Sequence, residues 1–443
     1  MRQRTPEIVA ATVLALLVAV FVAFGSAGGN GDDGAAESVS PERLARVEAR
    51  VERLRGLEFE RPVRVTVMSP AEVEAYGVRE ARASETRARA AAGEELMKLL
   101  GLIDADVDMD AVTSSIYGEQ VAGFYDPRTE RLALVAGVGI DDVTLAHELT
   151  HALEDQHFDL SRLGGSSEAA SAGSTADDDR ASAESGLVEG TATAVMTRYL
   201  ERYPEALSFG DALGQLWGAT GSTPLPPYIM SSLLFPYQQG ERFVDALLAR
   251  GGWETVDDAL RARPPLATAD LYEPKRWFAR TRPAVLELPD DDAPGAGWRL
   301  LETSTLGIFD LRALLAEAVG ERAAATLGAG WRGGRYALWR KGPLPADDCE
   351  APCTARDALT LRLRFRNAAE AGAVSAAFGS WLAATHGARR TGSVGWRGVG
   401  GAPDAMTTGW TLDGGTAAVT RNGGADVTVT LAPTPALAAR LSR

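Results

Sequence analysis

The first feature of the sequence that suggests chemistry is a cluster of histidines. Three of the four histidines of this 443-residue chain lie in HELTHALEDQH, residues 147–157. On a helix, His147 and His151 are four residues apart and project from the same face, where both can reach one metal ion. Glu148 lies at the rim of that face, where its carboxylate can take a proton from metal-activated water. The pattern predicts a zinc site that hydrolyses an amide or ester bond, with Glu148 as general base. The alternative is two histidines that hydrogen-bond backbone carbonyls in a core.

The identity of the third zinc ligand follows less directly from the sequence. His157 has the outer spacing of the HExxHxxGxxH pattern, but Glu154 occupies the position where that pattern has a glycine. Glycine readily adopts the left-handed conformation that turns the third histidine back to the metal, whereas glutamate does not, so we expect the helix to continue and His157 to point away. Glu189, in SGLVEGTATAV, lies in an apolar stretch, where an acid is destabilising unless it is paired or metal-bound. Glu184 and Glu154 are rival carboxylates in more polar surroundings. The alternative role of Glu189 is that of a salt-bridged glutamate or one at the rim of a helix.

A hairpin and two helices are predicted to position these residues. Two β-prone runs, 121–125 and 132–135, flank Asp-Pro-Arg-Thr and predict a hairpin before the histidine helix. That helix is expected to end where a flexible acidic insertion, 164–179, begins. An apolar stripe over 187–199 then predicts the helix that carries Glu189.

Length and composition predict more than one folded unit. We predict a first unit at 41–283, a linker rich in Pro, Asp and Gly at 284–295, and a smaller α+β unit at 296–443. Pro236 is expected to kink or divide a helical region of the first unit. The predicted fold class of the whole chain is α+β.

Residues 1–28 are predicted to be a secretory signal or a membrane anchor, followed by a linker at 29–40. Two arginines precede the uncharged run 8–24, and acidic residues follow it, an orientation that leaves the rest of the chain outside the cytoplasm. A helix over this run spans about 25 Å, short of the hydrocarbon core of about 30 Å. An uncleaved anchor is favoured, and a cleaved signal or a buried helix are the alternatives. In such a compartment Cys349 and Cys353 favour a disulfide over two unlinked thiols.

The catalytic pattern also carries a family resemblance. HELTHALEDQHFDL, followed after a spacer by LVEGTAT, resembles the gluzincin-type (peptidase MA-like) zinc metallopeptidases, particularly poorly characterised bacterial members. GFYDPRTERL resembles the hairpin before their active-site helix, FPYQQGERFVDAL their downstream helix with Tyr and Gly, and LYEPKRW a short segment that ends their catalytic unit. The likeness covers roughly residues 40–283. It implies a zincin-like catalytic domain with a mixed sheet and hairpin, the active-site helix and a helical lower part.

The resemblance also implies roles for individual residues. It places zinc on His147, His151 and Glu189. It makes Glu148 the general base and Tyr237 a hydrogen-bond donor to the oxyanion, although Tyr237 is equally consistent with a packed aromatic residue.

Two further expectations concern the surroundings of the zinc ion. Many relatives have an aspartate four residues after the ligand glutamate, where it orients a ligand histidine; here that position is Thr193, and Asp155 is a candidate substitute. In proteases of this type an edge strand beside the helix pairs with extended substrate, and either 121–125 or 132–135 can present that edge.

We therefore expect a zinc-dependent metallohydrolase, a membrane-anchored or secreted peptidase that acts on a peptide or protein substrate outside the cytoplasm. Contact with the membrane is expected through the N-terminal helix. A nucleic-acid partner is not expected, because the formal net charge is −15. The alternatives are a non-catalytic zincin-fold protein that binds or supports other components of the cell envelope, and a zinc hydrolase of a non-peptide bond.

Overall fold

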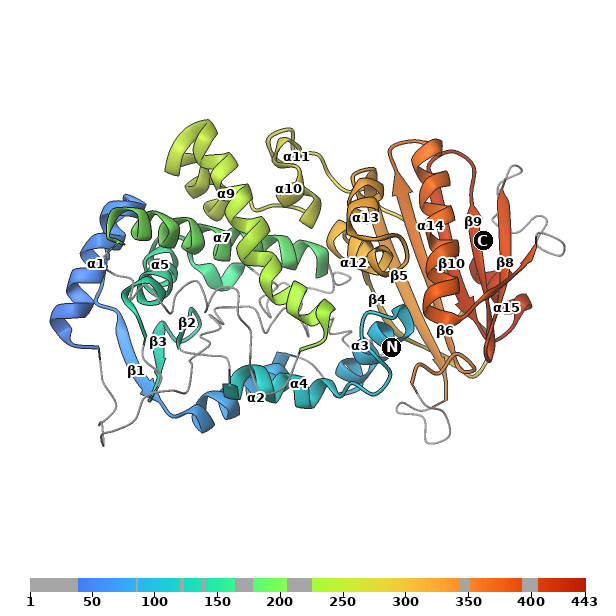
Figure 1. Ribbon diagram of the computed structural model, residues 1–443, viewed down its shortest axis with the longest axis horizontal. Coiled ribbons are helices and arrows are strands. Elements are labelled where there is room, and N and C mark those ends of the chain that lie inside the picture. The colour runs from blue at the N-terminus through green and yellow to red at the C-terminus, as the bar shows by residue number, and fades with distance from the viewer. Residues whose placement is uncertain are drawn as a thin grey trace, which may run out of the picture.

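The chain folds into an α+β structure with two sheets, which confirms the predicted fold class. The computed structural model describes residues 39–84, 87–119, 123–137, 140–163, 178–204, 225–342, 351–392 and 405–443. The predicted anchor and nearly all of the predicted acidic insertion lie outside these residues. Among the helices of the described ranges, none is long and apolar enough to cross a membrane. Figure 1 shows the two sheets toward opposite ends of an elongated molecule, with long helices between them.

The smaller sheet contains the predicted hairpin. Its strands lie in the order β1 (Arg64–Met68), β3 (Arg131–Val135) and β2 (Gly123–Asp126). β2 and β3 are antiparallel, and β1 is parallel to β3. β3 is thus the central strand, so the alternative that placed 132–135 at the edge is wrong. Among the described strands, β2 has a neighbour on one side only.

Four helices form a packed group beside the hairpin. They are α1 (Pro41–Arg55), α5 (Asp142–Phe158), α7 (Asp178–Arg202) and α9 (Pro227–Arg261). α5 packs against α1, α7 and both strands of the hairpin, and α7 packs along α9. A short 3-10 helix, η2 (Leu160–Arg162), follows α5, and α10 (Thr268–Tyr272) and α11 (Pro274–Phe278) follow α9.

The helix α9 is not divided at Pro236, contrary to one sequence-based expectation. It departs from helical dihedral angles only at Gly251 and at Gly252, whose φ of 65° is left-handed. Glycine adopts this conformation without a Cβ clash, whereas a helix can bend around the hydrogen bond that proline lacks. The interruption therefore falls at the glycine pair.

The larger sheet has seven antiparallel strands, with helices on both faces. Its order is β4 (Trp298–Thr305), β5 (Trp331–Lys341), β6 (Asp357–Phe365), β10 (Asp426–Ala432), β9 (Gly415–Arg421), β8 (Met406–Leu412) and β7 (Arg389–Gly392). Alternation along β5 sends Tyr336 and Leu338 into one core and Ala337 and Trp339 into another. The first core contains α12 (Ile308–Val319), α13 (Glu321–Gly328) and α14 (Ala368–His386), and the second contains α15 (Pro435–Leu441).

Parts of the predicted first unit contribute to the core of the larger sheet. Three helices run along the lower side of the molecule in Figure 1: α2 (Pro70–Ser84), α3 (Arg87–Leu100) and α4 (Met109–Glu119). Leu96, Leu99 and Leu100 of α3 lie in one hydrophobic cluster with β5, β6 and α14. The indole N–H of Trp381 donates to the carbonyl of Leu100 at 3.1 Å.

The start of α7 and the backbone of Cys353 also link the two parts of the chain. At the start of α7, the N–H of Asp178 donates to Ser304 Oγ at 3.3 Å and that of Asp179 to Thr305 Oγ1 at 3.1 Å, both on β4. Cys353 is disulfide-bonded, as the sequence predicted, and its N–H donates to the Glu95 carboxylate of α3 at 2.7 Å. Its only possible partner within the chain, Cys349, lies outside the described residues.

Candidate metal centre

The helix α5 is held at its N-terminus by its own cap. Asp141 precedes the helix, and its Oδ1 accepts from the N–H groups of Val143 at 2.8 Å and Thr144 at 2.7 Å. These bonds satisfy amide donors that have no partner inside the helix. The cap fixes the start of α5 one turn before His147.

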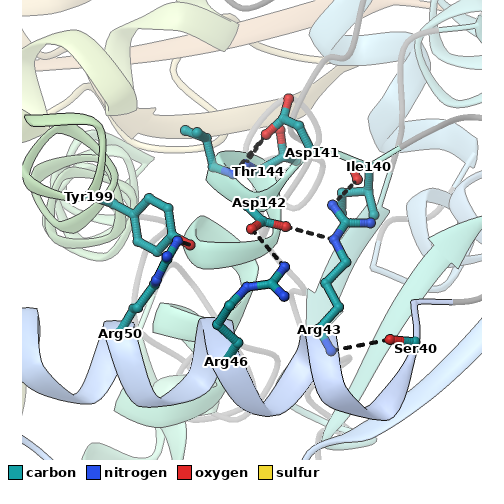
Figure 2. A network of polar contacts seen from close by, with 10 residues as sticks. Ser40, Arg43, Arg46, Arg50, Ile140, Asp141, Asp142, Thr144 and Tyr199 are labelled. Atoms are coloured by element: carbon teal, nitrogen blue, oxygen red, sulfur yellow. Dashed lines mark hydrogen bonds and ion pairs between the residues drawn. The ribbon is translucent and has the colours of Figure 1, made fainter. Parts of the chain in front are cut away.

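The helix α1 lies across this end of α5, as Figure 2 shows. Arg43 Nε lies 2.6 Å from Asp142 Oδ1, and Arg43 also donates to the carbonyl of Ile140 at 2.6 Å. Arg46 lies 3.3 Å from the other oxygen of Asp142. Further along α1, Arg50 donates to the hydroxyl of Tyr199 on α7 at 3.0 Å (Figure 2). One helix thus contacts both of the helices that carry the candidate ligands.

The crossing of α7 and α9 depends on glycines. A Cβ on Gly190 would lie 2.2 Å from the backbone carbon of Gly240, and one on Gly240 would lie 2.0 Å from the carbonyl oxygen of Gly186. These separations are far below van der Waals contact, so any larger residue would force the helices apart. The close crossing brings Glu189 of α7 and Tyr237 of α9 to the same place as the histidines of α5.

The structure brings His147, His151 and Glu189 together in a buried group that can hold a metal ion. The Nε2 atoms of the two histidines are 3.1 Å apart. Glu189 Oε2 lies 3.2 Å from His147 Nε2 and 3.4 Å from His151 Nε2. The three residues are 0%, 2% and 1% exposed, respectively.

This triangle of atoms fits a tetrahedral metal. Ligands at about 2.0–2.1 Å from a tetrahedral zinc ion are separated by about 3.3–3.4 Å, close to the three observed distances. Two imidazoles and one carboxylate are also a donor set found in catalytic zinc sites, in which a fourth position stays open for water or substrate. The arrangement therefore satisfies both the geometry and the chemistry of a metal centre.

The three residues of this group differ in their protonation. Burial lowers the pKa of His147, so that its imidazole is neutral at pH 7 and can act as a ligand. Burial alone would raise the pKa of Glu189, but His151 and His147 lower it to about 2. For His151 the effect of burial is outweighed by Glu189, which raises the pKa to about 9. The ionised carboxylate of Glu189 would attract a cation, but the cation would have to displace the proton of His151 to bind both imidazoles.

Glu148 lies beside these three residues and is completely buried. Its Oε2 accepts from the N–H of Tyr125 on β2 at 2.8 Å, while Oε1 has no hydrogen-bond partner among the described residues. Burial raises its pKa to about 8, with the negative charge of Glu189 acting in the same direction. A carboxylate with a raised pKa and one available oxygen is suited to proton transfer.

Tyr237 also lies at the centre. Its ring centroid is 5.8 Å from that of His147, and its side chain hydrogen-bonds with Glu189. Burial raises the pKa of this phenol well above its usual value, so it stays protonated and able to donate.

The other sequence candidates for the third ligand lie elsewhere. His157 Nε2 is 2.8 Å from the carbonyl of Glu58, on a different side of α5. Glu154 pairs with Arg55 at 2.6 Å, and Glu184 pairs with Arg180 at 2.7 Å.

The suggestion that Asp155 orients a ligand histidine is wrong. Both of its oxygens are engaged away from the histidines, because Oδ2 accepts from the Tyr125 hydroxyl and Oδ1 from the N–H of Leu160, each at 2.8 Å. Thr193 donates to the carbonyl of Glu189 in its own helix at 2.7 Å. The contacts of Tyr125 were not predicted, since its donor to Glu148 is a backbone group that carries no sequence signal.

The fold and site define an α+β protein with a buried His-His-Glu centre. Residues 297–442 match the protein family described as "Domain of unknown function (DUF8575)". No curated protein matches the sequence. A crystal structure described as "a putative hydrolase with a novel fold from Chloroflexus aurantiacus" is similar at a TM-score of 0.32 and 17% identity, over 54% of this chain and 89% of that chain. The functional proposal therefore rests on the metal centre.

Proposed function

We propose that the protein is a zinc-dependent hydrolase, and more specifically a peptidase. The observation that carries the proposal is the convergence of His147, His151 and Glu189 at tetrahedral spacing with Glu148 beside them. Hydrolytic zinc sites of this kind contain three protein ligands and a neighbouring carboxylate that serves as the base. From the N-terminal sequence we further propose that the enzyme is anchored in a membrane or secreted.

The residues of the site divide the chemical work between them. A bound zinc ion would act as a Lewis acid and activate water. Glu148 is held through Oε2, so its Oε1 is available to take the proton of the attacking water and return it to the leaving group. Tyr237 stays protonated, and its hydroxyl would have to leave Glu189 to donate to the oxygen on which negative charge develops.

The edge strand β2 supports a peptide as the substrate. Its outer edge has no neighbour among the described strands, and its residue Tyr125 is one hydrogen bond from Glu148. An extended peptide that paired with the other backbone groups of this edge would run past the general base, because the N–H of Tyr125 itself is bonded to Glu148. A small ester would make no use of such an edge.

The proposal is tested by metal content and hydrolysis together. The purified chain should carry about one zinc ion, as measured by elemental analysis, and should cleave members of a diverse peptide library. Glu148→Gln should keep the zinc ion and lose activity by about 100-fold or more, because the general base is gone while the ligands remain. Glu321→Gln, at an exposed position of α13, is the control and should behave as the wild type.

Three outcomes would count against the proposal. A protein that holds zinc but cleaves neither peptides nor esters would be a binding or structural protein. Hydrolysis of ester or cell-wall substrates alone would assign a non-peptide bond. Full activity in Glu148→Gln would exclude this carboxylate as the base.

A further inference from the structure

Tyr125 is attached to α5 at two points. Its backbone N–H donates to Glu148 Oε2 and its hydroxyl donates to Asp155 Oδ2, both at 2.8 Å. Glu148 and Asp155 are seven residues apart in α5, which is about two turns, so they lie on the same face of the helix. The Tyr125 side chain is buried and spans these two turns.

The hydroxyl contact is itself firmly placed. Asp155 Oδ1 accepts from the N–H of Leu160 at 2.8 Å, after the chain has turned at Asp159, whose φ is 53°. The carboxylate is therefore held from the far side while its other oxygen receives the Tyr125 hydroxyl. A carboxylate fixed in this way can limit the displacement of the strand that carries Tyr125.

This second attachment matters because β2 pairs with only one strand, β3, over only four residues. β2 has four residues, and its register with β3 runs from Gly123 opposite Leu134 to Asp126 opposite Arg131. A strand this short, paired with a strand on one side only among the described residues, is weakly fixed by backbone pairing alone. A shift of β2 would move the N–H of Tyr125 away from Glu148.

We propose that Tyr125 and Asp155 form a positioning pair that fixes the edge strand β2 on α5 and, through the Tyr125 N–H, holds Glu148 in place as the base. Neither residue touches the reacting atoms. The pair acts on the orientation of Glu148 and leaves the metal ligands unaffected. The consequence for catalysis rests on the proposed function, whereas the consequence for the mobility of β2 does not.

Tyr125→Phe removes the hydroxyl and keeps the ring and the backbone N–H. In the zinc-loaded full chain, kcat should fall by about tenfold while KM and zinc content stay near the wild-type values. Amide hydrogen exchange at residues 123–126 should become faster, because the strand has lost its second attachment. Tyr336→Phe is the matched control, since Tyr336 also donates to a buried carboxylate, that of Glu302 at 3.1 Å, in the larger sheet.

A second variant tests whether Tyr125 and Asp155 act together or independently. Asp155→Asn keeps an acceptor for the N–H of Leu160 and removes the charge that receives the hydroxyl. If the two residues act as a pair, the double variant should lose no more kcat than Tyr125→Phe alone. Multiplied losses, or loss of zinc in either single variant, would overturn the proposal.

Exchange measurements keep the two proposals distinguishable. Unchanged exchange at residues 123–126 in Tyr125→Phe would overturn the positioning pair even if the wild type is an active peptidase. Faster exchange in that variant, together with a wild type that cleaves nothing, would support the attachment of β2 and reject the proposed function.

Discussion

The residue at position 154 determines how the histidines of α5 are used. Glu154 is buried and paired with Arg55 at 2.6 Å, and α5 continues through it to Phe158. An uninterrupted helix carries His157 away from His147 and His151, so a third metal ligand would have to come from another element. This much follows from the sequence, because the conformational preference of a single residue controls it. The buried partner Arg55 lies 99 positions earlier in the chain and could not be predicted.

Glu189→Gln tests the ligand set. The neutral amide is a poor zinc ligand, so we expect zinc affinity to fall by about 100-fold or more, a larger loss than that from removing a supporting hydrogen bond. The zinc-dependent gain in stability, about 2.7 kcal/mol at a zinc concentration 100 times Kd, should disappear. Chelator competition and thermal unfolding measure these effects.

Two further variants complete this test. Glu201→Gln, at an exposed position of the same helix, should retain wild-type affinity. His157→Ala should also retain it, and a loss of zinc in His157→Ala would reassign the third ligand.

At the level of elements, the hairpin and the histidine helix were predictable because their signals are local. Turn residues between two apolar runs and a helix cap at Asp141 operate over a few residues. The crossing of α7 and α9 is different, since it depends on Gly240 meeting Gly186 and Gly190 across 50 or more residues of chain. The sequence showed the Gly of LVEG, but its partner becomes visible only in the fold.

Gly240→Ala tests this crossing. The added methyl group would meet the backbone of Gly186, which cannot move as a flexible side chain can. The free energy of unfolding should fall by about 1–3 kcal/mol, and zinc affinity should fall with it because Glu189 moves with α7. Urea unfolding and chelator competition provide the measurements.

Gly93→Ala is the control: this helix position has open space around the added Cβ, so stability should rise by about 0.5–1 kcal/mol. Unchanged stability in Gly240→Ala would mean that the helices can separate without penalty.

At the scale of the whole molecule, the composition change at 284–295 does not separate two independent cores. Leu96, Leu99 and Leu100 precede it, yet they lie in one cluster with the larger sheet. Composition reports where a chain becomes polar, and it does not report which distant apolar faces meet. For this reason the sequence indicated the α+β class but not the shared core.

A chain that ends at residue 283 should therefore fail to fold. It would expose the apolar face of α3 and remove the acceptors that Ser304 and Thr305 offer to α7. We expect loss of the cooperative unfolding transition and of stoichiometric zinc, measured by circular dichroism and elemental analysis. Adding residues 284–443 as a separate chain should restore both, at least in part. A truncated chain that unfolds cooperatively and binds zinc like the full chain would contradict this view.

The helix α7 connects these scales. Its first residues bond to β4, its middle carries Glu189, and its last turns receive Arg50 through Tyr199. The 25 residues of α7 span about 37 Å. One continuous helix therefore joins the candidate metal centre to the contact with β4. Linkage through such an element is reciprocal. If a ligand that changes the contact between β4 and α7 also changes the affinity of the site for a metal ion, the metal ion must change the affinity for that ligand by the same factor.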